Sequence, residues 1–422
     1  MLLLLAAMSA LGATTFSDLA PVIEKRCVGC HQAGEIAPMP LTNYEEIRPW
    51  AKAIRAAVLR KSMPPWSANP AQTVHLANSR ALSPKEIDTI TSWVDAGAPG
   101  GNTAIHTSPR AAGWRMGKPD LVVKVPAHAV AATGVMEYVF LVTATDIPAD
   151  KWIRAAEWKI DQPSVVHHMN AFIRPPGSSY LKDALKGVTY VATRADRAAR
   201  RPDEAETDRR ELLLGYEPGY MPIGWENRGK LLRKGSDIVF EIHYTPNGKA
   251  TQDSTELGIY FATTPPRERV LTLTPADANF NIPPGDPAYV SKISATFTRD
   301  VELISLQPHM HFRGKAFVVT LSYPDGRAVP LLDVPKYDFN WQTTYFLANP
   351  MKLPAGSTIY YTAVFDNSSN NRANPDPTKS VQWGDQSFEE MNVGFTEVAF
   401  PANADPDVAT LSGTTRPKPT TN

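Results

Sequence analysis

Two cysteines and nine histidines are the residues of this chain best suited to redox or metal chemistry. Both cysteines, Cys27 and Cys30, lie directly before His31 in the pattern C-x-x-C-H. This is the spacing of covalent c-type haem attachment, in which two thioether bonds hold the porphyrin and the next residue presents its imidazole to the iron. The rivals are a zinc site, which needs further Cys or His ligands nearby, and a thioredoxin-like site, which needs a βαβ context. Neither accompanies this motif, so we expect one covalent haem c.

A methionine is the expected sixth iron ligand, because a thioether raises the haem potential toward an electron-transfer role. Met63 is the preferred candidate, since Pro64 and Pro65 stiffen its loop. Met39, which also lies between prolines, is the alternative.

Five other histidines fall in stretches with the pattern of β-strands: His167, His168, His243, His309 and His311. In a strand, His309 and His311 point to one face about 6.5 Å apart, which suits a single metal ion. His167 and His168 face opposite sides of a regular strand, so they reach one metal only where the strand is bulged or strongly twisted. Burying five imidazoles on apolar strands would cost too much desolvation for purely structural roles, which favours metal binding.

The cysteine count restricts the metal. With both thiols assigned to haem, the chain cannot form a blue-copper, iron–sulfur or Cys-rich zinc site. Imidazole together with a thioether favours copper, Cu(I) especially, whereas imidazole alone is compatible with zinc or iron. A methionine on a neighbouring strand would discriminate between these.

The elements that must position these residues change in type along the chain. Helical periodicity and capping predict helices over Phe16–Arg26, over Tyr44–Leu59 and after Ser83, where Pro84 and Glu86 complete a helix start. From Asp120 onward, short β-branched runs separated by turns predict strands, over Leu121–Val125, Tyr138–Thr143, Val165–Ile173, Ile238–Tyr244, Leu257–Ala262, Val301–His311, Ala316–Ser322 and Thr358–Phe365. The predicted fold class is therefore multidomain, with a small all-α cytochrome c domain followed by two all-β jelly-roll sandwich domains.

The predicted organisation divides the chain into six parts. Residues 1–13 read as a signal peptide, 14–100 as the cytochrome c domain, 101–119 as a linker, 120–264 and 265–402 as the two jelly rolls, and 403–422 as a disordered tail. Equal numbers of basic and acidic residues, 43 each, give no electrostatic case for nucleic acid as a partner. The signal peptide predicts export, so we expect a periplasmic or secreted protein. No other run is long and apolar enough to span a membrane.

Four motifs occur in a family-specific order: His167-His168-Met169, Glu241-Ile242-His243-Tyr244, His309-x-His311 before Arg313-Gly314-Lys315, and Glu389-Glu390-Met391. Over roughly residues 120–402 the chain resembles the copper type II, ascorbate-dependent monooxygenases, the family of peptidylglycine α-hydroxylating monooxygenase and dopamine β-hydroxylase. The resemblance implies two consecutive jelly rolls with one copper each. It assigns His167, His168 and His243 to an electron-transferring copper, and His309, His311 and Met391 to the copper that activates dioxygen.

The chain departs from that family in two respects, and its N-terminal part resembles a different group of proteins. The chain has no cysteine left for the disulfides of the animal enzymes, and Asn392 stands where their motif has Cys. The segment Cys27–Trp66 resembles haem modules fused to bacterial periplasmic oxidoreductases.

The expected function is an exported copper monooxygenase that hydroxylates a C–H bond of a small-molecule or peptide substrate with dioxygen. Two coppers and one haem c are the expected cofactors, His309, His311 and Met391 the catalytic set, and an ascorbate-like reductant or a redox protein the external electron donor. The alternative is a periplasmic haem and copper electron-transfer or copper-binding protein without an organic substrate of its own.

Overall fold

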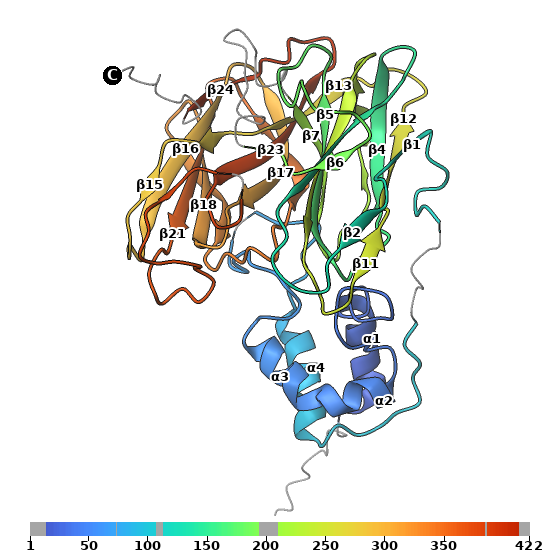
Figure 1. Ribbon diagram of the computed structural model, residues 1–422. Helices are drawn as coiled ribbons and strands as arrows, with labels where there is room; N and C mark the ends of the chain where they lie inside the picture. Colours follow the sequence, from blue (N-terminus) through green and yellow to red (C-terminus); the bar gives the residue numbers. More distant parts are fainter. Residues whose placement is uncertain (1–13, 73, 107–112, 194–209, 385, 413–422) are drawn as a thin grey trace, which may run out of the picture. The chain divides into compact units, whose positions relative to one another are not determined.

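The computed structural model describes residues 14–72, 74–106, 113–193, 210–384 and 386–412, so the signal peptide predicted for residues 1–13 lies outside the described residues. The chain divides into two compact units (Figure 1). The first, called here the helical unit, lies within Met1–Trp66 and Arg80–Arg110. The second, called the β unit, comprises Ser67–Ser79 and the chain from Ala111 onward. None of the described helices is long and apolar enough to cross a membrane.

The helical unit contains the helices where the sequence pattern predicts them. They are α1 (Phe16–Arg26), α2 (Tyr44–Ile47), the 3₁₀ turn η1 (Arg48–Trp50), α3 (Ala51–Leu59) and α4 (Pro84–Asp95). The predicted start of α4 is confirmed: Ser83 and Glu86 form a capping box, and Pro84 occupies the first turn. Phe16, Ile54 and Trp93 are buried in the core of this unit.

The predicted fold class is wrong. The described residues are mostly β-sheet, about 10% of the chain is helical, and the part that the structure describes contains no sizeable all-α cytochrome c domain. The physical reason is that the longest helix has only 12 residues, and the segment Ser67–Ser79, expected within the helical domain, belongs to the β unit. In place of two separate jelly rolls, strands from both sides of residue 265 share one sheet.

The β unit contains the strands of the chain, and every strand predicted from the sequence is present within a few residues. They are β1 (Leu121–Lys124), β2 (His128–Val130), β3 (Val139–Ala144), β4 (Lys151–Lys159), β5 (Val166–Arg174), β6 (Thr189–Tyr190), β7 (Glu211–Tyr216), β8 (Ile223–Gly224), β9 (Arg228–Leu232), β10 (Asp237–Tyr244), β11 (Thr251–Asp253), β12 (Glu256–Phe261), β13 (Glu268–Leu273), β14 (Ala276–Asp277), β15 (Asn281–Ile282), β16 (Tyr289–Phe297), β17 (Val301–His309), β18 (Gly314–Ser322), β19 (Ala328–Val334), β20 (Tyr345–Leu353), β21 (Thr358–Phe365), β22 (Val381–Gln382), β23 (Asn392–Pro401) and β24 (Ala409–Ser412).

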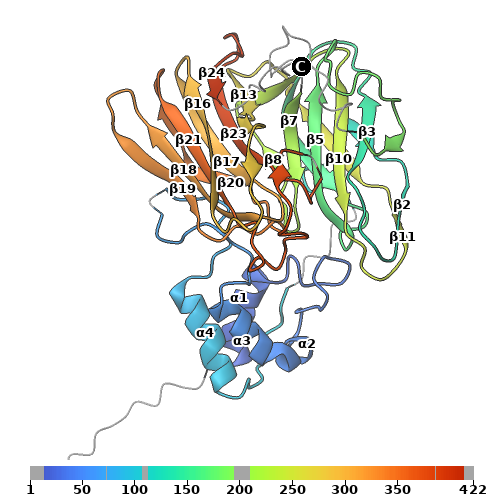
Figure 2. The same cartoon turned by 60° about the vertical axis from the view of Figure 1, so that its left-hand side comes forward.

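These strands form three main sheets. A 10-stranded sheet follows the order β1-β12-β4-β9-β13-β23-β17-β20, with β8 and β14 paired at its side. Two 5-stranded sheets have the orders β6-β3-β10-β5-β7 and β19-β18-β21-β16-β24. In Figure 2 the β16, β18 and β21 group and the β3, β5 and β10 group stand on opposite sides of the β unit. Strand β24 lies within the segment 403–422, for which the sequence predicts disorder.

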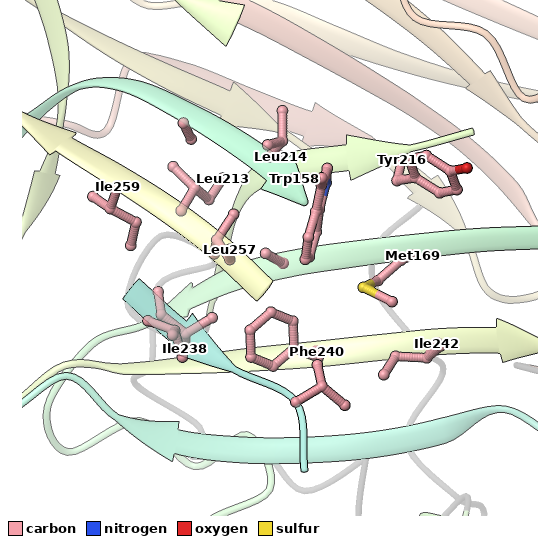
Figure 3. Packing of buried hydrophobic residues seen from close by; sticks show 14 of the residues in the cluster. Trp158, Met169, Leu213, Leu214, Tyr216, Ile238, Phe240, Ile242, Leu257 and Ile259 are labelled. Atoms are coloured by element: carbon pink, nitrogen blue, oxygen red, sulfur yellow. The ribbon is translucent and has the colours of Figure 1, made fainter. Parts of the chain in front are cut away.

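The alternation of residues along β10 and β5 decides which side chains enter the core. Ile238, Phe240 and Ile242 of β10 pack into one apolar cluster with Met169 of β5, and Figure 3 shows Phe240 beside Trp158, with ring centroids 5.7 Å apart. Successive side chains of a strand point to opposite faces. The intervening residues of both strands therefore share the other face of this sheet, and this face carries the histidines.

A buried ion cluster joins the β7 sheet to the 10-stranded sheet. The Lys230 side chain on β9 is 0% exposed, and its Nζ lies 3.1 Å from Glu211 Oε1 on β7 and 3.3 Å from Glu397 Oε1 on β23. It also donates to Thr272 Oγ1 on β13 at 2.7 Å. A buried ammonium group destabilises the fold unless nearby acceptors compensate for the water it has lost, so each of these partners contributes to stability.

We expect Lys230→Met to destabilise the β unit by about 3–5 kcal/mol, because it removes the cation paired with buried Glu397 and leaves Glu211 with Arg269 alone, at 3.4 Å. Lys159→Met is the control: Lys159 is 43% exposed in its pair with Glu256, and its loss should cost less than about 1 kcal/mol. Urea unfolding of the three proteins measures both effects, and equal midpoints would contradict this role of Lys230.

In the helical unit, Glu86 of α4 is hydrogen-bonded to Arg26, the residue before the Cys27–His31 motif. Arg26, directly before Cys27, donates from Nε to Glu86 Oε1 at 2.8 Å, and the Ser83 N–H donates to Glu86 Oε2 at 2.7 Å. Burial opposes ionisation of Glu86, but these hydrogen bonds outweigh it and lower its pKa to about 2.

Glu86→Gln should lower the stability of the helical unit by up to about 1 kcal/mol at pH 7. Because the pKa of Glu86 is lower in the folded state, its contribution is complete above about pH 4.5 and declines as the pH falls toward 2. Thermal unfolding from pH 7 to pH 3 should therefore show the two proteins converging, while exposed Glu45→Gln stays near wild type throughout. A difference that is constant over this range would refute the ion-pair explanation.

Candidate metal centre

The first histidine cluster stands on the face of the β5–β10 pair opposite to Phe240 and Met169, and His168 and His243 are buried there. His168 on β5 is directly opposite His243 on β10, and the register then shifts so that Tyr244 is opposite Val166. His167 is therefore the extra residue of a β-bulge. The sequence predicted that His167 and His168 could reach one metal only where the strand is bulged or strongly twisted, and this bulge is present.

The three imidazoles are spaced as ligands of one metal ion. One ligand atom from each of His167, His168 and His243 lies within 4.8 Å of the others. The Nδ1 atoms of His167 and His243 are 3.4 Å apart. Two nitrogens bound tetrahedrally at about 2.0–2.1 Å from a metal would stand about 3.3–3.4 Å apart. The spacing therefore fits a copper- or zinc-sized ion held through Nδ1 of His167 and His243. His168 Nε2 lies 3.4 Å from the Asn340 carbonyl oxygen, which leaves the lone pair on His168 Nδ1 for the same ion.

The second cluster stands at the end of β17. His309 is the last residue of that strand, His311 lies two residues beyond it, and their rings are perpendicular with centroids 5.1 Å apart. His309 Nδ1 is hydrogen-bonded to Gln342 Oε1, and His311 Nδ1 lies 3.2 Å from the Glu389 carbonyl oxygen. Because both Nδ1 atoms donate to oxygens, Nε2 is the atom that each histidine offers to a metal.

Glu390 holds the chain around this second cluster. Its carboxylate is completely buried and accepts hydrogen bonds from the backbone N–H of His311 at 2.8 Å, of Arg313 at 2.5 Å and of Met391 at 3.3 Å. Met391 directly precedes β23. The last residue pair between β17 and β23 is His309 opposite Val393. Continuing this register by two residues brings Met391 opposite His311. The half-buried Met391 thioether is thus carried by the chain that borders the two histidines.

Burial keeps four of the five imidazoles neutral, those of His167, His168, His243 and His311. Loss of solvation lowers the pKa of His167 to about 4 and that of His243 to about 3. Burial likewise moves the pKa of His168 and of His311 far below the ordinary value, with the neighbouring histidines adding to the effect. Neutral imidazoles keep the lone pairs that metal binding requires.

One loop contacts both clusters. Residues 335–344, called here the bridging loop, connect β19 to β20. The ring of Phe339 lies 5.5 Å from that of His168, 6.0 Å from His243 and 5.9 Å from His311. The Asn340 carbonyl oxygen lies 3.4 Å from His168 Nε2.

Sequence reasoning assigned no role to the bridging loop or to Glu390. Phe339 and Gln342 belong to an irregular stretch without periodicity, so no local signal marks them. Glu390 directly precedes Met391 within a quoted motif, and a carboxylate next to a proposed ligand was the signal available for it.

The haem motif lies at the end of α1. Cys27 and Cys30 are half-buried and form no disulfide, and burial raises the pKa of Cys27 to about 12. His31 Nδ1 is 3.1 Å from the Met39 carbonyl oxygen, which leaves His31 Nε2 for iron. Met39 packs against the helical core, whereas Met63, the preferred sixth ligand, is 41% exposed. Two thiols and an oriented imidazole fit covalent haem attachment.

Comparison with known proteins identifies no family. No family model matches the chain, and no curated protein matches it. Among solved structures, infectious bursal disease virus of the Gx strain is similar at 11% identity and a TM-score of 0.20 over 69% of this chain and 73% of that one. PNGF-II is similar at 13% identity and a TM-score of 0.25, over 66% and 60% of the two chains. At these values the likenesses give no functional information.

Copper titration tests the two clusters. We expect the wild-type chain to bind two copper ions, and His243→Ala to bind one, because two remaining imidazoles hold the first ion far more weakly. His128→Ala is the control, since His128 stacks on Tyr244 at 5.3 Å and belongs to neither cluster. Copper per chain after gel filtration gives the count, and an unchanged count in His243→Ala would exclude the first site.

Proposed function

We propose that this chain is an exported copper-dependent monooxygenase that hydroxylates a C–H bond of an organic substrate with dioxygen, receiving electrons through a covalently attached haem c. The observation that carries the proposal is the presence of two unlike histidine clusters in one β unit, in which burial keeps His167, His168, His243 and His311 neutral. The order of their motifs, which resembles that of the copper type II, ascorbate-dependent monooxygenases, supplies the reaction class.

The two clusters differ in what they offer a metal. The first would hold copper through the Nδ1 atoms of His167, His168 and His243. The second would hold it through Nε2 of His309 and His311 and the thioether of Met391. Bound copper would supply one-electron redox chemistry and, where a coordination position stays open, the reduction of dioxygen.

The chain's own groups orient these ligands and exclude water. The Glu389 carbonyl oxygen fixes the tautomer of His311, while Glu390 holds the backbone on both sides of the second cluster. Phe339 fills space beside both clusters with an apolar ring. Such fixed partners commonly set the affinity and potential of a metal site.

The electron count gives the haem motif its place. Hydroxylation puts one oxygen atom of dioxygen into the substrate and the other into water, which takes two electrons and two protons from outside. A haem carries one electron at a time, so the first cluster is suited to hold the second electron. Cys27, Cys30 and His31 would hold the haem, with Met63 as the preferred sixth ligand and Met39 as the alternative. An ascorbate-like reductant or a redox protein would supply electrons to the haem.

A second function is favoured by one observation. Because the bridging loop occupies space between the clusters, the chain would also suit a periplasmic haem and copper electron-transfer or copper-binding protein without an organic substrate. Oxygen uptake separates the two functions: the monooxygenase consumes dioxygen in proportion to an added C–H substrate, and the electron-transfer protein does not. A panel of peptides, phenethylamines and other compounds with activated C–H bonds is the appropriate probe.

Met391→Ile should abolish substrate-dependent oxygen uptake while the first cluster still loads with copper, because the substitution removes a thioether and keeps an apolar side chain. Met221→Ile is the control, since Met221 is 68% exposed. Copper analysis and an oxygen electrode give the two readouts. Full hydroxylation by Met391→Ile would disprove the assignment of Met391.

A further inference from the structure

The side chain of Gln342, which is 7% exposed, lies between the two clusters. Its Oε1 accepts a hydrogen bond from His309 Nδ1. Its Nε2 lies 3.3 Å from His168 Nδ1 and 3.3 Å from the Phe339 carbonyl oxygen. Two hydrogen bonds and one amide group thus connect a histidine of each cluster over at most about 8 Å.

An amide has one accepting end and one donating end, so Gln342 acts differently on the two histidines. At His309 it accepts the Nδ1 proton, which leaves Nε2 free for a metal. At His168 it donates to Nδ1, the type of nitrogen that His167 and His243 turn toward each other. Gln342 therefore supports metal binding at the second cluster and competes with the metal at the first.

The backbone that carries this amide is held in place by two further contacts. Gln307 Nε2 donates to the main-chain carbonyl oxygen of Gln342 at 2.9 Å. The Tyr337 hydroxyl ties the start of the bridging loop to the Met310 backbone, accepting from its N–H at 3.0 Å and donating to its carbonyl at 2.8 Å. Because Met310 lies between His309 and His311, the loop and the second cluster are held as one piece.

We propose that Gln342 couples the two metal sites, so that filling the His309 and His311 site weakens copper binding at the His167, His168 and His243 site, and the reverse. A metal on His309 Nε2 makes its Nδ1–H a stronger donor. That bond polarises the amide, and the amide N–H then holds the His168 lone pair more strongly. By linkage, the first site weakens the second by the same factor. This inference rests on the proposed two-copper function.

A thermodynamic cycle tests the coupling, with Cu(I) as the probe under anaerobic conditions and a chromophoric chelator as the competitor. Affinity at the second site is measured in the wild-type chain with its first site filled. It is measured again in a His167→Ala, His243→Ala double variant, whose first site cannot fill while His168 and Gln342 remain. We expect a ratio of about fivefold or more.

The same pair of measurements in a Gln342→Leu background should bring the ratio close to one, because leucine keeps the volume and removes both ends of the amide. Because the coupling is a ratio within one background, a general loss of affinity in Gln342→Leu does not affect it. Gln342→Asn, whose shorter side chain cannot reach both histidines, gives the same reading if Gln342→Leu does not fold. Gln252→Leu is the matched control and should keep the wild-type ratio, since Gln252 is exposed on β11 and its loss leaves the Gln342 amide in place.

The outcomes separate the inference from the proposed function. A ratio of one in the wild-type chain, or an unchanged ratio in both Gln342 variants, overturns the coupling and leaves the two copper sites standing. Fewer than two copper ions per wild-type chain overturns the proposed function and the coupling together.

Discussion

One buried ammonium group connects the sheets on which the two clusters stand. Lys230 is held by Glu211 from the 5-stranded sheet of His168 and His243, and by Glu397 from the 10-stranded sheet of His309. An ion buried between two sheets is satisfied only when both are in place, so this contact favours one relative arrangement over others that would bury the same apolar area. Strands β7 and β23, which carry these glutamates, pair directly with β5 and β17, which carry His168 and His309. The ion cluster therefore helps to set the separation of the two histidine clusters, which the Gln342 side chain links.

The charge of the first cluster bears on which ion it selects. All three of its donors are neutral, and their low pKa values come chiefly from burial. A divalent ion held there would keep two positive charges in a poorly solvated place, with Asp338 as an acidic group that acts on His167 from nearby. A monovalent ion keeps one. Burial therefore favours Cu(I) over Zn²⁺ or Cu(II), and shifts a copper couple toward the reduced state.

Short sequence patterns predicted the individual helices and strands of this molecule. The capping residues of α4 and the alternating runs of β5, β10 and β17 identified those elements, and the adjacency of His167 and His168 required the bulge that is present. The fold class failed because periodicity locates helices but does not show whether they form a sizeable domain. The contact of Gln342 with His168 spans 174 residues. It arises from sheet pairing, which no short pattern encodes.

The position of the segment Ser67–Ser79 gives the bridging loop a second constraint. This segment follows Met63–Trp66 in the chain, yet it packs in the β unit. Asn69 bonds to Asp333 near the end of β19, and Asn78 bonds to the Thr344 carbonyl oxygen at 2.7 Å and to the Phe346 N–H at 3.1 Å. Both ends of the bridging loop are thus fastened to the chain that enters and leaves the helical unit. Contacts that span 264 to 268 residues thus hold the loop that carries Phe339 and Gln342, so the position of this loop depends on a segment that precedes every strand of the β unit that the structure describes.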